Sequence, residues 1–168
     1  MNYAGAGLIL LSSDLTSALL VRDARTGKWG FPKGHREESD VSDLACAIRE
    51  TFEETGLTSE DYVVKEDVFK ISKGGQAYLF RYAVMKSDGK RLRAGPAYEI
   101  GGLEWIPLQT LFGAQTIIDG NKYLRTWISD VKASINKKSV NLFLRLLGGV
   151  RLTPSQESVC PSNIVTCS

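Results

Sequence analysis

The chain shows two hydrophobic periods, one typical of strands and one typical of helices. Five segments have the strand-like pattern, in which apolar residues alternate with polar ones or form short unbroken runs. They span residues 4–12, 16–21, 61–71, 76–85 and 103–107. Because segment 76–85 is apolar on both faces, we expect it to lie in the middle of a sheet. The sequence Ser72-Lys73-Gly74-Gly75 predicts a hairpin turn that joins it to segment 61–71.

Helical spacing of apolar residues predicts three helices. The first begins near Ser39, Asp40 or Ser42, each a plausible N-cap, and ends at Gly56, which suits a left-handed C-cap. The second spans residues 123–135 and carries one apolar stripe: Tyr123, Leu124, Trp127, Ile128, Val131 and Ile135. The third spans residues 140–147. Strands and helices in this order predict an α/β fold.

Length and composition agree with one folded domain. A chain of 168 residues with 43% hydrophobic content can bury a sizeable core, so we expect a single domain over 1–150 and a disordered tail over 151–168. The net charge of +2 says little about partners. Three cysteines form no disulfide framework and favour a reducing compartment, so we expect a cytoplasmic or nuclear location. The apolar run near the N-terminus is too short to span a membrane, and we expect no membrane partner.

The most informative chemistry lies in the first predicted helix. Glu50, Glu53 and Glu54 fall at i, i+3 and i+4, so they share one helix face. Like charges at this spacing repel, and a purely structural helix gains nothing from them. Mg2+ prefers carboxylate oxygens supplemented by water and substrate phosphates, so the cluster predicts a metal site for a phosphate-bearing substrate. The alternative is a solvated acidic face on which Arg49 pairs with Glu53.

Together with the preceding Trp29-Gly30-Phe31-Pro32-Lys33-Gly34-His35, this helix resembles the Nudix hydrolase family. The family's box reads G-x5-E-x7-R-E-U-x-E-E-x-G-U, where U is an aliphatic residue. The chain matches its glycines, its later charged positions and its last aliphatic one: Gly34, Arg49, Glu50, Glu53, Glu54, Gly56 and Leu57. The resemblance implies an α/β/α sandwich with a mixed central sheet. It also implies that a diphosphate is hydrolysed with the help of Mg2+, for which Mn2+ is an alternative.

The chain departs from the box at two places. One residue more than the box prescribes separates Gly34 from Arg49, so we expect an insertion in the loop that follows Gly34. Three acids are candidates for the early glutamate of the box: Glu37, Glu38 and Asp40. A strict count back from Arg49 reaches Val41 instead. The other departure is Thr51, which stands at an aliphatic position, and neither departure removes a metal-binding carboxylate.

The resemblance implies roles for the residues that match. Glu53 and Glu54 are the expected principal metal ligands and catalytic acids, and Glu50 is a direct or water-mediated ligand. The metal would activate the attacking water and stabilise the developing negative charge. The carbonyl of Gly34 often serves as a further ligand in the family. Arg49 is expected to orient a box glutamate.

Further candidates lie outside the box. Glu99 precedes the Trp105-bearing strand and resembles the glutamate that acts as metal ligand or general base in several Nudix subfamilies; the alternative is an exposed loop acid. Lys33 is expected to neutralise substrate phosphate. Several rings could stack on a base, although most such rings pack in cores: Trp29, Phe31, Tyr78, Tyr98 and Trp105. We expect substrate contacts from Trp29, Phe31 and Tyr98.

Two Nudix subfamilies suggest the substrate. Decapping members carry the WGFPKG of residues 29–34, and viral decapping members are also similar over residues 42–50. Dinucleoside polyphosphate hydrolases share the segments 32–35 and 49–51. We therefore expect cleavage of the 5′ cap of mRNA, with diadenosine tetraphosphate or a diphosphoinositol polyphosphate as alternatives.

Two further alternatives concern partners. The basic residues that follow Lys122 could contact an RNA backbone or form a solvated helix face: Arg125, Lys132, Lys137, Lys138, Arg145 and Arg151. A nucleotide-binding regulatory module is the non-enzyme alternative. Such modules typically lose box glutamates, and this chain keeps Glu50, Glu53 and Glu54. The sequence carries no signal for an oligomeric state.

Overall fold

A computed structural model describes residues 3–113 and 118–135, with the side chains of Lys73 and Ile135 left out. The strands are β1 (Gly5–Leu11), β2 (Ser17–Asp23), β3 (Trp29–Gly30), β4 (Lys33–His35), β5 (Tyr62–Lys73), β6 (Gln76–Met85) and β7 (Ile100–Pro107). The helices are α1 (Asp43–Thr55), α2 (Leu108–Phe112) and α3 (Lys122–Ile135). None of these helices is long and apolar enough to cross a membrane.

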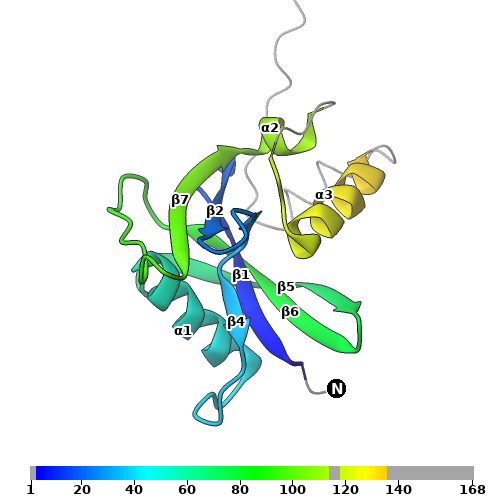
Figure 1. Cartoon of the computed structure of the whole chain (residues 1–168). Helices are drawn as coiled ribbons and strands as arrows, with labels where there is room; N and C mark the ends of the chain where they lie inside the picture. Colours follow the sequence, from blue (N-terminus) through cyan, green and yellow to red (C-terminus); the bar gives the residue numbers. More distant parts are fainter. Residues whose placement is uncertain (1–2, 114–117, 136–168) are drawn as a thin grey trace, which may run out of the picture.

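The strands form one seven-stranded sheet of mixed direction (Figure 1). Its order is β3-β2-β1-β6-β5, while β4 pairs with β1 and β7 pairs with β2. The β1–β6 pair is parallel and the other pairs are antiparallel. Strand β6 lies between β1 and β5, which confirms the central position predicted from its two apolar faces.

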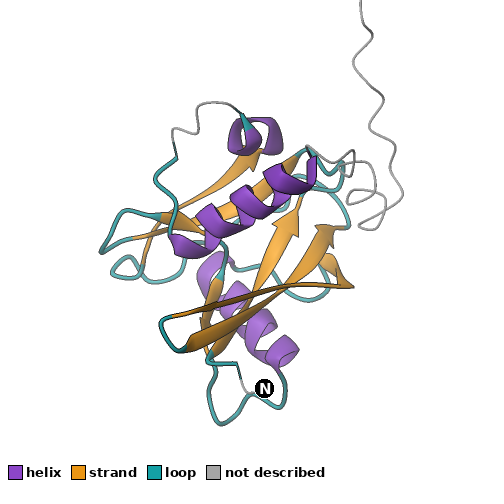
Figure 2. Ribbon diagram, turned by 90° about the vertical axis from the view of Figure 1, so that its right-hand side faces the viewer, coloured by secondary structure: helices purple, strands orange, loops and turns teal. Residues whose placement is uncertain are grey.

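Helices cover both faces of the sheet, as the α/β/α prediction requires (Figures 1 and 2). Alternate residues of β1 show the two layers, since successive side chains of a strand point to opposite faces. Leu8 and Leu10 join a core with Cys46 and Ala47 of α1. The intervening side chains Ile9 and Leu11 join a larger core that contains the buried stripe of α3: Tyr123, Leu124, Trp127, Ile128 and Val131.

The structure confirms the five predicted strands and two of the predicted helices, with ends that shift by up to three residues. Two short strands, β3 and β4, and the helix α2 were not predicted, because segments of two to five residues carry no measurable hydrophobic period. The hairpin turn is tighter than predicted: β5 extends to Lys73 and Gly74 and Gly75 make the turn with positive φ angles. The predicted helix 140–147 and tail 151–168 lie outside the described residues.

Candidate active site

Helix α1 presents its carboxylates because its other face is buried. Ser42 is the N-cap and accepts a hydrogen bond from the Ala45 N–H (3.0 Å), which decides among the three predicted caps. Gly56 ends the helix in the left-handed conformation, with φ 74°. The buried face consists of small side chains, namely Cys46, Ala47, Thr51 and Thr55, so the helix packs closely on the sheet. This packing leaves the opposite face, with its three glutamates, for chemistry.

Arg49 forms hydrogen bonds with acidic residues of α1 and with the strand before it. Its Nη1 atom donates to Glu50 Oε1 at 2.9 Å and to Glu53 Oε2 at 3.0 Å. Its Nη2 atom donates to the His35 carbonyl at 3.0 Å, which ties α1 to β4. The Glu53 side chain is 51% exposed, whereas that of Glu50 is 14% exposed. Arg49 therefore contacts two of the three box glutamates, and its orienting role stays a prediction.

Asp40 takes the place predicted for the early glutamate of the box. Its carboxylate accepts two hydrogen bonds from Arg49, Nε–Oδ1 at 3.1 Å and Nη2–Oδ2 at 2.9 Å. The hydrogen bond from Arg49 outweighs burial and lowers the pKa of Asp40 to about 2. Asp40 lies six positions after Gly34, as in the box, so the extra residue lies after Asp40 and not before it. Val41, which a strict count from Arg49 selects, is 89% exposed and does not fill this role.

Glu54 is the carboxylate most strongly perturbed by its surroundings. Desolvation raises its pKa to about 8, and the nearby charges of Glu50 and Glu99 add to this effect. Lys33 opposes the shift through its charge and through its backbone N–H, which donates to Glu54 Oε2 at 3.1 Å. Desolvation also raises the pKa of Glu50, although Arg49 opposes it. Partly buried acids with raised pKa values are typical of functional sites.

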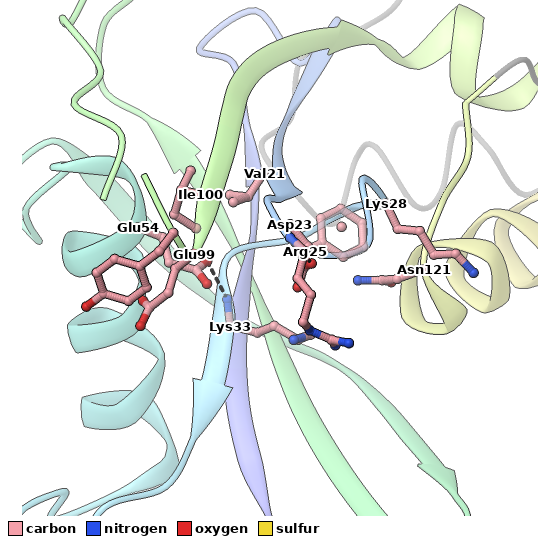
Figure 3. A pocket seen from close by; sticks show the side chains of 12 residues that line it. Val21, Asp23, Arg25, Lys28, Lys33, Glu54, Glu99, Ile100 and Asn121 are labelled. Carbon is pink, nitrogen blue, oxygen red and sulfur yellow. Dashed lines mark hydrogen bonds between the residues drawn. The ribbon is translucent and has the colours of Figure 1, made fainter. Parts of the chain in front are cut away.

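A pocket of about 290 Å3 opens beside Glu54. Figure 3 shows Glu54 and Glu99 at one end, Lys28 and Asn121 at the other, and Lys33 and Arg25 between them. Apolar side chains complete the walls: Val21, Phe31 and Ile100. Asp23 also lines the pocket, beside Arg25, so the pocket has an acidic end and an end where basic side chains outnumber acidic ones.

Glu99 reaches the pocket because the segment before β7 is attached to the β2–β3 turn. The Glu99 carbonyl accepts a hydrogen bond from the Ala24 N–H at 2.8 Å. The neighbouring Tyr98 also lines the pocket, and it is 77% exposed. Glu104 is exposed on β7. Glu99 and Glu54 are thus brought together although 45 positions separate them in the sequence.

The other predicted substrate residues have mixed positions. Lys33 lines the pocket, and its Nζ atom lies 5.7 Å and 5.4 Å from the ring centroids of Tyr78 and Tyr123. Phe31 also lines it but is only 2% exposed and packs edge-on against Phe80 and Trp127, so it can form a wall and not an exposed stacking platform. Trp29 is half-buried and does not line this pocket.

Four polar or charged pocket residues were not predicted, namely Asp23, Arg25, Lys28 and Asn121. Arg25 and Lys28 belong to a polar turn without a motif, so only the fold brings them to the site. Asn121 caps α3: its Oδ1 atom accepts from the N–H groups of Tyr123 and Leu124, both at 3.0 Å. Its own N–H donates to the Trp29 carbonyl at 2.7 Å, which brings the start of α3 to β3. Asn is a common N-cap residue, so the capping role of Asn121 could be read from the sequence. Its contact with Trp29 could not, because the two residues are far apart in the chain.

The residues on α1 fit a hard divalent cation by their chemistry. They offer carboxylate oxygens whose charge is partly desolvated, and such groups favour a bound cation. A side chain at Gly34 would overlap the Glu50 carboxylate, so the backbone there lies directly against a predicted ligand. Among the described residues, however, no three acidic, histidine or cysteine side chains converge into a ready-made metal cage. The predicted ligand set of Gly34, Glu50, Glu53 and Glu54 stays a prediction.

Among curated proteins, the chain is similar to two decapping proteins. It is 31% identical over 162 residues to the m7GpppN-mRNA hydrolase dcap-2 of Caenorhabditis elegans, which covers 89% of this chain and 20% of that protein. It is 31% identical over 106 residues to the mRNA decapping complex subunit 2 of Schizosaccharomyces pombe, which covers 62% of this chain and 14% of that protein. The chain thus spans at most about a fifth of the length of these relatives.

Solved structures and a family model identify the fold and the family. A C. elegans Ap4A hydrolase in a binary complex has a TM-score of 0.62 at 20% identity, covering 79% of this chain and 98% of that one. The NUDIX domain of Shewanella oneidensis NrtR, complexed with ADP ribose, has a TM-score of 0.58 at 15% identity, covering 80% and 89%. These likenesses show the fold. The family model described as the NUDIX domain matches residues 1–128, so the chain belongs to the Nudix hydrolase family, whose enzymes act on pyrophosphate bonds.

Proposed function

We propose that this chain is a Mg2+-dependent pyrophosphohydrolase that cleaves a diphosphate linkage in the 5′ cap of mRNA. The observation that carries the proposal is the pocket in which Glu54 and Glu99 face Lys33 and Arg25. A polyphosphate needs cationic partners along its length, and its hydrolysis needs an acidic group that can accept or hold a proton near the attacked phosphorus. The two ends of this pocket supply both.

Each residue has a distinct part in this reaction. Glu50, Glu53 and Glu54, with the carbonyl of Gly34, would hold Mg2+, which when bound polarises the phosphate and activates water. Glu99 lies at the same end of the pocket as Glu54 and is the candidate general base.

Two further residues would align the reacting groups. Arg49 keeps Glu50 and Glu53 turned to one side of α1 through its two hydrogen bonds. Lys33 aligns Glu54 through its backbone N–H, while its side chain stays available for a phosphate.

The choice of capped RNA rests on similarity to the decapping proteins and on the WGFPKG segment. The segments shared with dinucleoside polyphosphate hydrolases, together with the Ap4A hydrolase fold neighbour, make diadenosine tetraphosphate the second candidate. A cytoplasmic or nuclear location is part of the proposal, since capped RNA is found in both. Arg125 is exposed on α3 and is available to an RNA backbone, whereas Lys132 donates to the Gly113 carbonyl at 2.8 Å. The basic residues 137, 138, 145 and 151 lie outside the described residues.

Product analysis with Mg2+ tests the proposal. The purified chain is incubated separately with capped RNA, diadenosine tetraphosphate, a diphosphoinositol polyphosphate and ADP-ribose, and the products are separated by anion exchange. We expect m7GDP from capped RNA at the highest kcat/KM, and no product when EDTA is added. A higher kcat/KM for diadenosine tetraphosphate would overturn the cap assignment. Failure to cleave any of these substrates would overturn the proposed activity.

A further inference from the structure

The turn between β2 and β3 holds two cations at the pocket in a fixed arrangement. The Asp23 Oδ1 atom accepts hydrogen bonds from the N–H groups of Arg25 (3.0 Å) and Thr26 (2.6 Å) and from Thr26 Oγ1 (2.9 Å). The Arg22 Nε atom donates to the Gly27 carbonyl at 3.3 Å. These hydrogen bonds fix the backbone of the turn that carries Arg25 and Lys28. The side chains of both residues line the pocket.

The two cations of this turn outnumber the one acid beside them among the described residues, since Asp23 also lines the pocket and its pKa is lowered by a backbone N–H of the turn and by the charge of Arg25. Among the described residues, neither Arg25 nor Lys28 forms an ion pair, and Lys33 between them and Glu54 forms none either. The Asp23 carboxylate is close, but its hydrogen bonds go to the turn itself. Three cations along one pocket that are only partly balanced by nearby acids repel one another, and an anion that reaches them relieves the repulsion.

The acidic end is suited to a different part of the same ligand. Carboxylates repel a phosphate unless a cation lies between them, so Glu54 and Glu99 would meet the scissile diphosphate through a metal. Lys33 lies between this end and the turn. The geometry points to Arg25 and Lys28 as the residues that bind a phosphate beyond the scissile pair, which makes the pocket selective for chains of three or more phosphates.

This inference rests on the proposed function, because it assumes that the acidic end receives a diphosphate. Its alternative is that the two cations serve the scissile diphosphate itself. In that case their loss would weaken all substrates equally. A second alternative is that this end of the pocket binds an uncharged nucleobase. In that case removing the charges of Arg25 and Lys28 would weaken the binding of no phosphate ligand.

The double variant Arg25→Gln with Lys28→Gln removes both charges and keeps side chains of similar length. Neither side chain donates a hydrogen bond to a described residue, so the fold should be retained. The matched control is Lys70→Gln, which removes an exposed charge on β5 outside the pocket. Far-UV circular dichroism and thermal unfolding of the three proteins check that they are folded alike.

Binding of methylene-bridged analogues of pyrophosphate and tripolyphosphate, which cannot be hydrolysed, is then measured by calorimetry with Mg2+ present. We expect wild type and Lys70→Gln to bind the tripolyphosphate analogue at least about tenfold more tightly, since charge-assisted hydrogen bonds add on this scale. The double variant should lose this difference while it binds the pyrophosphate analogue as before. Equal binding of both analogues by wild type, or equal weakening of both in the double variant, would overturn the inference.

A kinetic measurement separates this inference from the proposed function. The ratio of kcat/KM for the cap dinucleotide GpppG over that for ADP-ribose should fall about tenfold in the double variant and stay unchanged in Lys70→Gln. An unchanged ratio in the double variant would overturn the inference. A wild type that prefers the tripolyphosphate analogue but hydrolyses no substrate would reject the proposed activity and still support the binding role of the turn.

Discussion

Replacing Asp40 by Asn tests whether the Asp40–Arg49 pair organises the start of the carboxylate helix. Asn has nearly the same shape but no charge, so it keeps at most one of the two bonds that Arg49 donates. The Asp40 side chain is only 4% exposed, and solvent therefore screens the pair poorly. Arg49 would lose its main anchor while it still contacts Glu50 and Glu53.

The size of the effect follows from the pKa of Asp40. The difference between its ordinary pKa of 3.8 and its pKa of about 2 in the folded protein corresponds to about 2.4 kcal/mol, since one pKa unit is worth about 1.36 kcal/mol. Because the folded pKa is the lower one, this stabilisation is fully present well above pH 4 and is lost as the pH falls through about 2. At pH 3 about 1.3 kcal/mol should remain.

Urea unfolding at several pH values measures this contribution. Wild type should be about 2 kcal/mol more stable than Asp40→Asn at pH 7, and the gap should shrink to roughly half at pH 3. The control is Glu37→Gln, since Glu37 also faces Arg49 at 3.7 Å but its side chain is 61% exposed, and the change should cost less than about 0.5 kcal/mol. Equal stability of Asp40→Asn and wild type at pH 7, or a gap that does not shrink towards pH 3, would refute the reasoning.

The same site supports four further predictions. Glu53→Gln and Glu54→Gln should each abolish Mg2+-dependent hydrolysis with the fold intact by circular dichroism; full activity in both would refute the metal assignment. Without metal, Glu54→Gln should also unfold at a higher temperature than wild type, because it removes a carboxylate that desolvation disfavours, and a lower temperature would contradict this. Glu99→Ala should lower kcat far more than stability, whereas unchanged kcat would remove Glu99 from the site. Gly34→Ala should lower both activity and stability, because the added methyl group overlaps the Glu50 carboxylate, and wild-type behaviour would show that the helix can move aside.

Local pattern was sufficient for much of the fold. The five long strands and helices α1 and α3 were predicted because each has a period of apolar residues and end signals that act within a few positions. The capping residues Ser42 and Gly56 are such signals, and the structure confirms both. Strands β3 and β4 were missed because they are too short to show a period and are held by pairing with other segments: β3 with β2 and Asn121, β4 with β1.

The sequence by itself determined the carboxylate helix, its family and the kind of chemistry, because the spacing of Arg49, Glu50, Glu53 and Glu54 is a property of one helix. Only the tertiary structure decided that Asp40 pairs with Arg49, since three neighbouring acids were equivalent until one of them was buried. It also decided which residues surround the pocket. Glu99, Arg25 and Asn121 come from separate segments, and long-range pairing of β2 with β7 and of β3 with the start of α3 brings them together. Such proximity depends on contacts across the whole chain, which no local period encodes.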